Sequence, residues 1–133
     1  MQIEILEFDS HKDNRGQLVA LEQNKNIPFE IKRVYYMFDT YPNFIRGKHA
    51  HKCLEQILVC VNGSCKILLD DGKEKEIVEL NDPSKGIYIS NNIWREMFDF
   101  SKGAVLMAIA SDYYNESDYI RNYDEFLKYV GVK

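Results

Sequence analysis

Two histidines separated by one alanine, His49 and His51, stand out in the segment RGKHAHKCLEQILVCVNGS at residues 46–64. On a β-strand they would point to the same face, about 7 Å apart, so both imidazoles could reach one ligand. An imidazole with an ordinary pKa of about 6.5 can hold a metal ion or move a proton near neutral pH. The pair therefore predicts a metal site, a proton-transfer site or a plain solvent-facing pair.

The residues that follow the histidines weigh against a metal. The spacing from His49 and His51 to Gln56 and Gly63 resembles the first motif of metal-binding cupins, in which a glutamate stands where this chain has Gln56. A later cupin histidine falls on Arg95, and a guanidinium cannot ligate a metal. Glu55 would point to the opposite side of the strand. We expect no metal, and a pocket that suits an anion or a developing oxyanion.

The preceding segment, IKRVYYMFDT at residues 31–40, would add polar groups to that pocket. Strand alternation puts Arg33 and Tyr35 on one face. If Arg33, Arg46 and Arg95 all point inward, they need anionic partners, because a buried unpaired charge costs several kcal/mol. Guanidinium groups match the paired oxygens of a diphosphate. With histidines beside them, they predict proton abstraction next to a carbonyl of a phosphorylated substrate.

The rest of the sequence indicates the scaffold. Its 133 residues, 45% of them hydrophobic, suffice for one domain over residues 1–133. Short runs rich in Val, Ile, Tyr and Leu alternate with turn signals, which is typical of an all-β sandwich or barrel. The turns at Asn62–Gly63 and Asp71–Gly72 predict hairpins between consecutive antiparallel strands. Helical spacing of aromatic residues predicts one C-terminal helix at about 117–130, with Ser117 as N-cap.

Composition excludes several function classes. A net charge of −4 argues against nucleic acid as a partner. No apolar run approaches the roughly 20 residues that cross a bilayer, and no leader pattern begins the chain, so we expect a cytoplasmic protein without a membrane partner. Three cysteines without CxxC spacing indicate neither a disulfide framework nor a thiolate zinc site.

Four segments together resemble one enzyme family over nearly the whole chain. They are residues 13–40 (DNRGQLVALEQNKNIPFEIKRVYYMFDT), 46–72 (RGKHAHKCLEQILVCVNGSCKILLDDG), 91–100 (NNIWREMFDF) and 110–126 (ASDYYNESDYIRNYDEF). They are similar to the cupin-type dTDP-sugar 3,4-ketoisomerases. The resemblance implies a cupin-like jelly-roll or β-barrel and an isomerase without cofactor or metal. It also implies a homodimer that exchanges N-terminal strands.

The family converts dTDP-4-keto-6-deoxyglucose into a dTDP-3-keto-6-deoxyhexose, which feeds the synthesis of 3-amino sugars for lipopolysaccharide and other bacterial surface glycans. The resemblance places the catalytic groups on His49, His51 and Tyr35. We expect His49 to remove the C3 proton and His51 to move a proton between the C3 and C4 oxygens, although the two histidines could exchange roles. Tyr35 would donate to the sugar oxygens or position them.

The substrate-binding residues follow from the same resemblance. We expect Arg33 and Arg46 at the diphosphate, Gln56 and Arg95 at the sugar, and Arg15, on an N-terminal strand, in the partner's site. Family members carry arginine or histidine at the place of Arg95 and differ in the face on which C4 is reprotonated. An arginine cannot readily deliver a proton, so Arg95 favours the gluco product. Arg15 stands at a second position that varies between the two product types.

Three other functions remain open at this point. A 3,5-epimerase of nucleotide-linked keto sugars would use the same barrel and acid–base groups without moving the carbonyl. A sugar-nucleotide-binding cupin would bind the ligand without turnover. A metal-dependent cupin oxygenase would carry stoichiometric iron, manganese or zinc.

Overall fold

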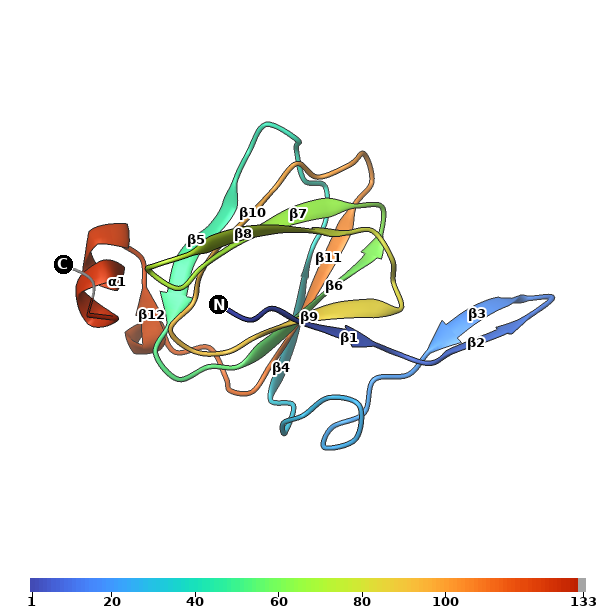
Figure 1. Ribbon diagram of the computed structural model, residues 1–133. Helices are drawn as coiled ribbons and strands as arrows, with labels where there is room; N and C mark the ends of the chain where they lie inside the picture. The colour runs from blue at the N-terminus through green and yellow to red at the C-terminus, as the bar shows by residue number, and fades with distance from the viewer. Residues whose placement is uncertain (132–133) are drawn as a thin grey trace.

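The computed structural model describes residues 1–131. Almost all of its regular structure is β-strand (Figure 1). The elements in chain order are β1 (Glu4–Glu7), β2 (Ser10–Asp13), β3 (Gly16–Val19), β4 (Arg33–Met37), β5 (Arg46–His51), β6 (Gln56–Asn62), β7 (Cys65–Asp70), β8 (Lys75–Leu80), β9 (Lys85–Ile89), β10 (Trp94–Phe98), β11 (Val105–Ala110), the 3-10 helix η1 (Glu116–Asp118), β12 (Tyr119–Ile120) and α1 (Tyr123–Tyr129). No helix within this part of the chain is long and apolar enough to cross a bilayer.

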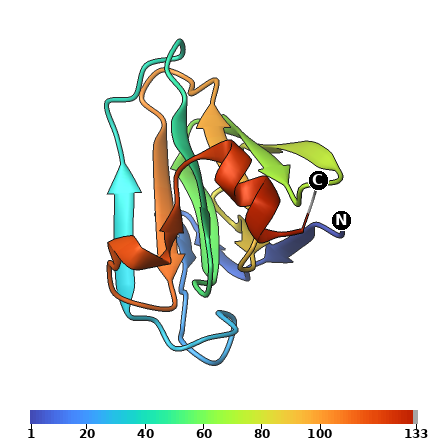
Figure 2. The same ribbon diagram turned by 90° about the vertical axis from the view of Figure 1, so that its left-hand side faces the viewer.

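Two five-stranded sheets face each other (Figures 1 and 2). The first sheet has the order β1-β9-β6-β11-β4 and the second has the order β12-β5-β10-β7-β8. Every pair of neighbouring strands in both sheets is antiparallel. This arrangement confirms the prediction of an all-β, cupin-like sandwich.

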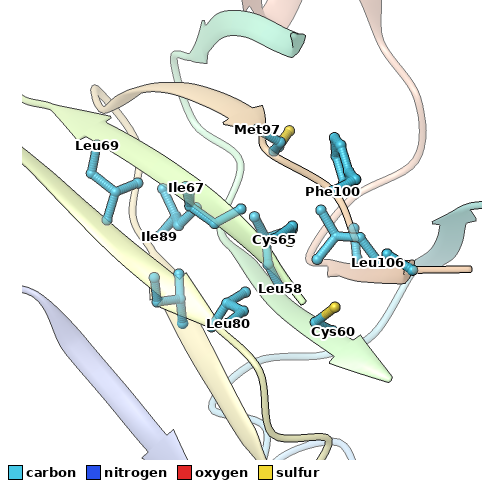
Figure 3. Packing of buried hydrophobic residues seen from close by; sticks show 13 residues of the cluster. Leu58, Cys60, Cys65, Ile67, Leu69, Leu80, Ile89, Met97, Phe100 and Leu106 are labelled. Atoms are coloured by element: carbon cyan, nitrogen blue, oxygen red, sulfur yellow. The ribbon is translucent and has the colours of Figure 1, made fainter. Parts of the chain in front are cut away.

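The core lies between the two sheets and comes from alternate residues of their strands (Figure 3). Leu58 and Cys60 of β6 point inward, and Ile67 and Leu69 of β7 meet them from the second sheet. Because strand side chains alternate, the same inward row of β6 begins with Gln56, which is fully buried. One stretch of the interior is therefore polar, and the candidate functional site lies there.

One predicted hairpin is confirmed and the other is wrong. At Asp71–Gly72 the chain turns with a Gly72 φ of 96°, and β7 and β8 pair directly. At Asn62–Gly63 the chain instead crosses from the first sheet to the second, so β6 and β7 are not paired. Gly63 is still required, because its φ is 72° and a Cβ there would lie 2.4 Å from Oγ of Ser101. The dipeptide specifies a turn but not which strands pair.

The C-terminal helix is shorter than the predicted span of 117–130. It begins at Tyr123, where the Asn122 side chain accepts a hydrogen bond from the Glu125 amide at 3.0 Å, and it ends at Tyr129. Ser117, the expected N-cap, lies in η1 instead, because β12 pairs with β5 in between. The helix lies against the outer face of the second sheet (Figure 2). Its Phe126 packs there with Ala50 and Trp94.

The β2–β3 hairpin projects from the sandwich and pairs only with itself in residues 1–131 (Figure 1). The sequence had predicted Arg15 on a strand, but Arg15 lies in the turn of this hairpin. The Arg15 side chain is 86% exposed and pairs with Asp13 at 2.7 Å. Strand β1, in contrast, pairs with β9 of its own chain.

Candidate active site

The two histidines of β5 point into the sandwich together. His49 is 8% exposed and His51 is 0% exposed, so the solvent-facing reading of the pair is wrong. Their ring centroids lie 4.9 Å apart, with the rings nearly perpendicular. Tyr119 of β12 packs against both, at 5.0 Å from His49 and 4.3 Å from His51. The pair is therefore a fixed, desolvated unit on one strand.

A row of hydrogen bonds runs beside the histidines from one sheet to the other. Arg95 of β10 pairs with His49 in the strand register. Its guanidinium donates to Oε1 of Gln56 and, at 2.9 Å, to the carbonyl of Ile93. Gln56 then donates through Nε2 to the phenol oxygen of Tyr35 on β4, 2.7 Å away. Gln56 and Arg95, which stand where metal-binding cupins have ligands, are thus hydrogen-bonded to each other.

The guanidinium of Arg95 is an unpaired charge inside the protein. It is fully buried, it has no carboxylate partner in the part of the chain that the structure describes, and its Nε has no partner at all. Burial lowers the pKa of Arg95 to about 10, so the group stays cationic at neutral pH. An uncompensated buried cation is costly, and a negative charge placed against it would be strongly favoured.

The side chains around the two histidines do not suit a metal ion. Within residues 1–131 no three His, Cys, Asp or Glu side chains come together as a metal site would need. The two imidazoles face a cationic guanidinium and an amide, neither of which balances a divalent charge. The site suits an anion or an oxyanion better than a cation.

Burial and charge also set the protonation of the site. Desolvation first, and then the Arg95 charge, lower the pKa of His49 to about 4, and the same causes lower the pKa of His51. Both imidazoles are therefore neutral near pH 7 and able to accept a proton. Burial raises the pKa of Tyr35, which stays a protonated phenol and a hydrogen-bond donor.

A cavity of about 380 Å³ opens over His49, Tyr119 and Tyr35. Three arginines line it, namely Arg33, Arg46 and Arg121. Arg33 is half-buried, and its guanidinium lies over the rings of Tyr35 at 5.0 Å and Tyr114 at 5.7 Å. The cavity therefore has His49 in its wall and positive charge around it, and His51 lies buried behind His49.

Arg46 is exposed at the rim of this cavity, which corrects the expectation that it is a buried inward charge. A β-bulge still places it on the cavity side. The register passes from Arg95 opposite His49 to Met97 opposite Arg46, so one residue of β5 is extra, and Lys48 has a φ of 54°. The extra residue reverses the alternation, so Arg46 and His49 serve the same cavity.

Sequence reasoning missed the residues that the segment before α1 adds to the site. Asp118 lies with Oδ2 3.0 Å from Nδ1 of His51. Arg121 lies over the Tyr119 ring at 4.3 Å and forms a two-pronged ion pair with Glu116 at 2.7 and 2.9 Å. The sequence had placed Asp118 and Arg121 in a helix. A buried catalytic histidine commonly has a carboxylate partner, but the sequence did not show which carboxylate it was.

Comparison with known proteins identifies the family of this chain. The family model FdtA (WxcM-like, C-terminal) matches residues 1–131. The TDP-4-oxo-6-deoxy-alpha-D-glucose-3,4-oxoisomerase of Aneurinibacillus thermoaerophilus is 55% identical over 131 residues, which cover 98% of this chain and 94% of that protein.

Two solved structures agree over most of their length. WlaRB, a TDP-quinovose 3,4-ketoisomerase from Campylobacter jejuni, has a TM-score of 0.91 and 60% identity, covering 95% of this chain and 97% of that one. A histidine-to-asparagine mutant of QdtA, a 3,4-ketoisomerase from Thermoanaerobacterium thermosaccharolyticum solved with TDP-4-keto-6-deoxyglucose, has a TM-score of 0.95 and 48% identity, covering 96% and 93%. The chain therefore belongs to the FdtA family, and it is a sugar 3,4-ketoisomerase of the cupin type.

Proposed function

We propose that this enzyme moves the keto group of TDP-4-keto-6-deoxyglucose from C4 to C3. The observation that carries the proposal is a buried pair of neutral imidazoles beside the unpaired guanidinium of Arg95. An isomerase of this kind needs proton acceptors next to a fixed positive charge, because the reaction passes through an enediolate. The substrate of the QdtA structure supports the same choice.

In the proposed mechanism, His49 removes the proton on C3, which lies next to the C4 carbonyl. Arg95 stabilises the negative charge that develops on the oxygen. His51 carries a proton between the C3 and C4 oxygens, and C4 then receives a proton, which leaves the ketone at C3. The ring-to-ring distance of 4.9 Å suits two groups that act on adjacent carbons of one sugar.

The binding residues divide along the cavity. Arg33 and Arg46 would hold the diphosphate, because both line the cavity and lie on the side that His49 faces. Tyr35, Gln56 and Arg95 would fix the sugar oxygens through their hydrogen-bonded row. A sugar seated there would lie against the histidines with its charged tail toward solvent.

We assign the gluco configuration to the product. Arg95 is the residue nearest in register to His49 and is a cation that holds its proton, so it fixes an oxygen but does not reprotonate C4. WlaRB, at 60% identity, is named for quinovose, which is 6-deoxyglucose. We propose that the 3-keto product is the substrate of an aminotransferase in the synthesis of 3-amino sugars for surface glycans.

The projecting hairpin fits a homodimer with exchanged N-terminal segments. Arg15 sits in the turn of a hairpin that pairs only with itself in residues 1–131, and its charge is partnered only by exposed Asp13. In the proposed dimer this turn reaches the cavity of the partner subunit, where Arg15 would contact the substrate.

The decisive test is incubation with TDP-4-keto-6-deoxyglucose in deuterated water, followed by NMR to locate the ketone. We expect a carbonyl at C3, deuterium at C4 and the gluco configuration there. A carbonyl still at C4 with deuterium at C3 and C5 would identify a 3,5-epimerase. Saturable binding without any exchange would identify a binding protein.

A further inference from the structure

His51 differs from His49 in having one ring nitrogen tied to a carboxylate. Nδ1 of His51 lies 3.0 Å from Oδ2 of Asp118. Nε2 of His51 has no partner within residues 1–131, and the same holds for both nitrogens of His49. An ionised carboxylate only accepts hydrogen bonds, so the hydrogen between the two groups belongs to Nδ1. In the neutral ring, Nε2 then carries the free lone pair.

Asp118 cannot easily turn away from this position. Its other oxygen, Oδ1, accepts a hydrogen bond from the Cys53 amide at 2.8 Å. Its main-chain carbonyl accepts another from the Lys52 amide at 2.9 Å. The next residue, Tyr119, pairs with His51 in the ladder between β12 and β5. The carboxylate is thus held at the end of the strand that carries the histidines.

We infer that Asp118 is a positioning residue of the isomerase, which holds His51 in the tautomer with hydrogen on Nδ1 and a proton-accepting Nε2. The inference rests on the proposed function and deepens it. Either role open to His51, taking the carbon proton or moving a proton between oxygens, needs an unprotonated nitrogen that is free to reach the substrate. His49 has no such partner, so Asp118 gives the two rings different starting states.

The Asp118→Asn variant tests this inference because the Cys53 amide fixes the orientation of the new side chain. The Cys53 amide still needs an acceptor, so the new side chain must turn its oxygen toward Cys53 and its NH₂ toward His51. Nδ1 of His51 then has to accept, and the hydrogen moves to Nε2. An asparagine that inverts a histidine tautomer in this way costs a known hydrolase about 10⁴-fold in kcat. We expect kcat here to fall at least about 100-fold, with KM changing less than about threefold.

Nitrogen NMR of protein labelled with ¹⁵N-histidine reads the tautomer directly. The chain has three histidines, so His11→Gln and His49→Asn variants suffice to assign the signals. We expect His51 to carry hydrogen on Nδ1 in the unmodified protein and on Nε2 in Asp118→Asn. The matched control is Asp112→Asn, which changes an exposed aspartate that bonds only to the neighbouring Tyr113 amide. It should keep full activity and an unchanged spectrum.

Three results would overturn the inference. One is hydrogen on Nε2 of His51 in the unmodified protein, a measurement that stands even if Asp118→Asn fails to fold. Another is an Asp118→Asn variant with unaltered kcat. The third is a loss of kcat while His51 keeps its tautomer, which would make Asp118 a purely structural clamp. The tautomer is independent of turnover, so failure of the proposed reaction would leave this readout intact.

Discussion

Gln56 and Tyr35 join across an intervening strand. Gln56 lies on β6 and Tyr35 on β4, yet Nε2 of one donates to the phenol oxygen of the other at 2.7 Å. Strand β11 runs between them and presents only Ala108 and Ala110 on its inner face at this level. Two small side chains thus leave room for a hydrogen bond that ties the outermost strand of the first sheet to the polar interior.

Removing the phenol oxygen of Tyr35 should disrupt the row of hydrogen bonds that orients Arg95. In Tyr35→Phe, Nε2 of Gln56 loses its acceptor, and an unsatisfied buried donor costs about 1–3 kcal/mol. We expect the free energy of unfolding to fall by about that amount and kcat to fall about 10–100-fold, because Gln56 no longer orients Arg95. Chemical denaturation and steady-state kinetics measure both.

A tyrosine away from the cavity provides the control for that experiment. Tyr129 lies on α1, is 50% exposed and does not line the cavity, so Tyr129→Phe should leave stability and turnover within error. Equal losses in the two variants would show that the phenol of Tyr35 has no special part in the site.

The histidines should matter for turnover and little for binding. We expect His49→Asn and His51→Asn each to lower kcat about 10²–10⁴-fold, the usual contribution of a positioned acid or base. The dissociation constant for TDP, measured by calorimetry, should change less than about threefold, because the proposed diphosphate-binding residues, Arg33 and Arg46, are unchanged in both variants. Full activity in either active-site variant would contradict the proposed mechanism.

The sequence predicted much of this site because the side chains that face inward on β4 and β5 follow strand alternation. His49, His51, Arg33 and Tyr35 lie on the faces that a period of two assigns them. The class of fold followed from the same periodicity. Arg46 also lines the predicted cavity, but it does so because of the bulge at Lys48, which strand alternation does not predict.

What the sequence could not predict depends on contacts between distant segments. Asp118 reaches His51 because β12 pairs with β5, and that pairing uses two residues that helical spacing had assigned to a helix. The turn at Asn62–Gly63 has the right local chemistry, yet its two strands pair with other partners in different sheets. Local patterns specify the conformation of a turn or a helix end, whereas the partners of a strand are decided by how the whole core is filled.

Acid should destabilise the fold in part through His49. Its pKa is lowered to about 4 in the folded protein, against about 6.5 in the unfolded chain. Between these values the unfolded chain binds more protons than the folded protein does. The stability that neutral His49 contributes is therefore complete above pH 6.5 and is lost as the pH falls toward 4. A pKa lowered this far corresponds to about 3 kcal/mol of stability.

Urea denaturation at several pH values checks this. We expect the free energy of unfolding to fall more steeply between pH 6.5 and 4 in the unmodified protein than in His49→Asn, which retains the same carboxylates and His51. Parallel curves for the two proteins would show that His49 is not held neutral by the fold.

The place of Arg15 can be tested by complementation between two inactive variants. If the β2–β3 hairpin reaches the cavity of a second copy, Arg15→Ala and His49→Asn should each be impaired alone. In a mixed dimer, one cavity combines the intact His49 of one subunit with the intact Arg15 of the other. Co-expression with two different tags should therefore yield hybrids with about half of the unmodified activity per dimer. Hybrids no more active than the average of the two parents would place Arg15 in its own subunit's cavity, or in neither.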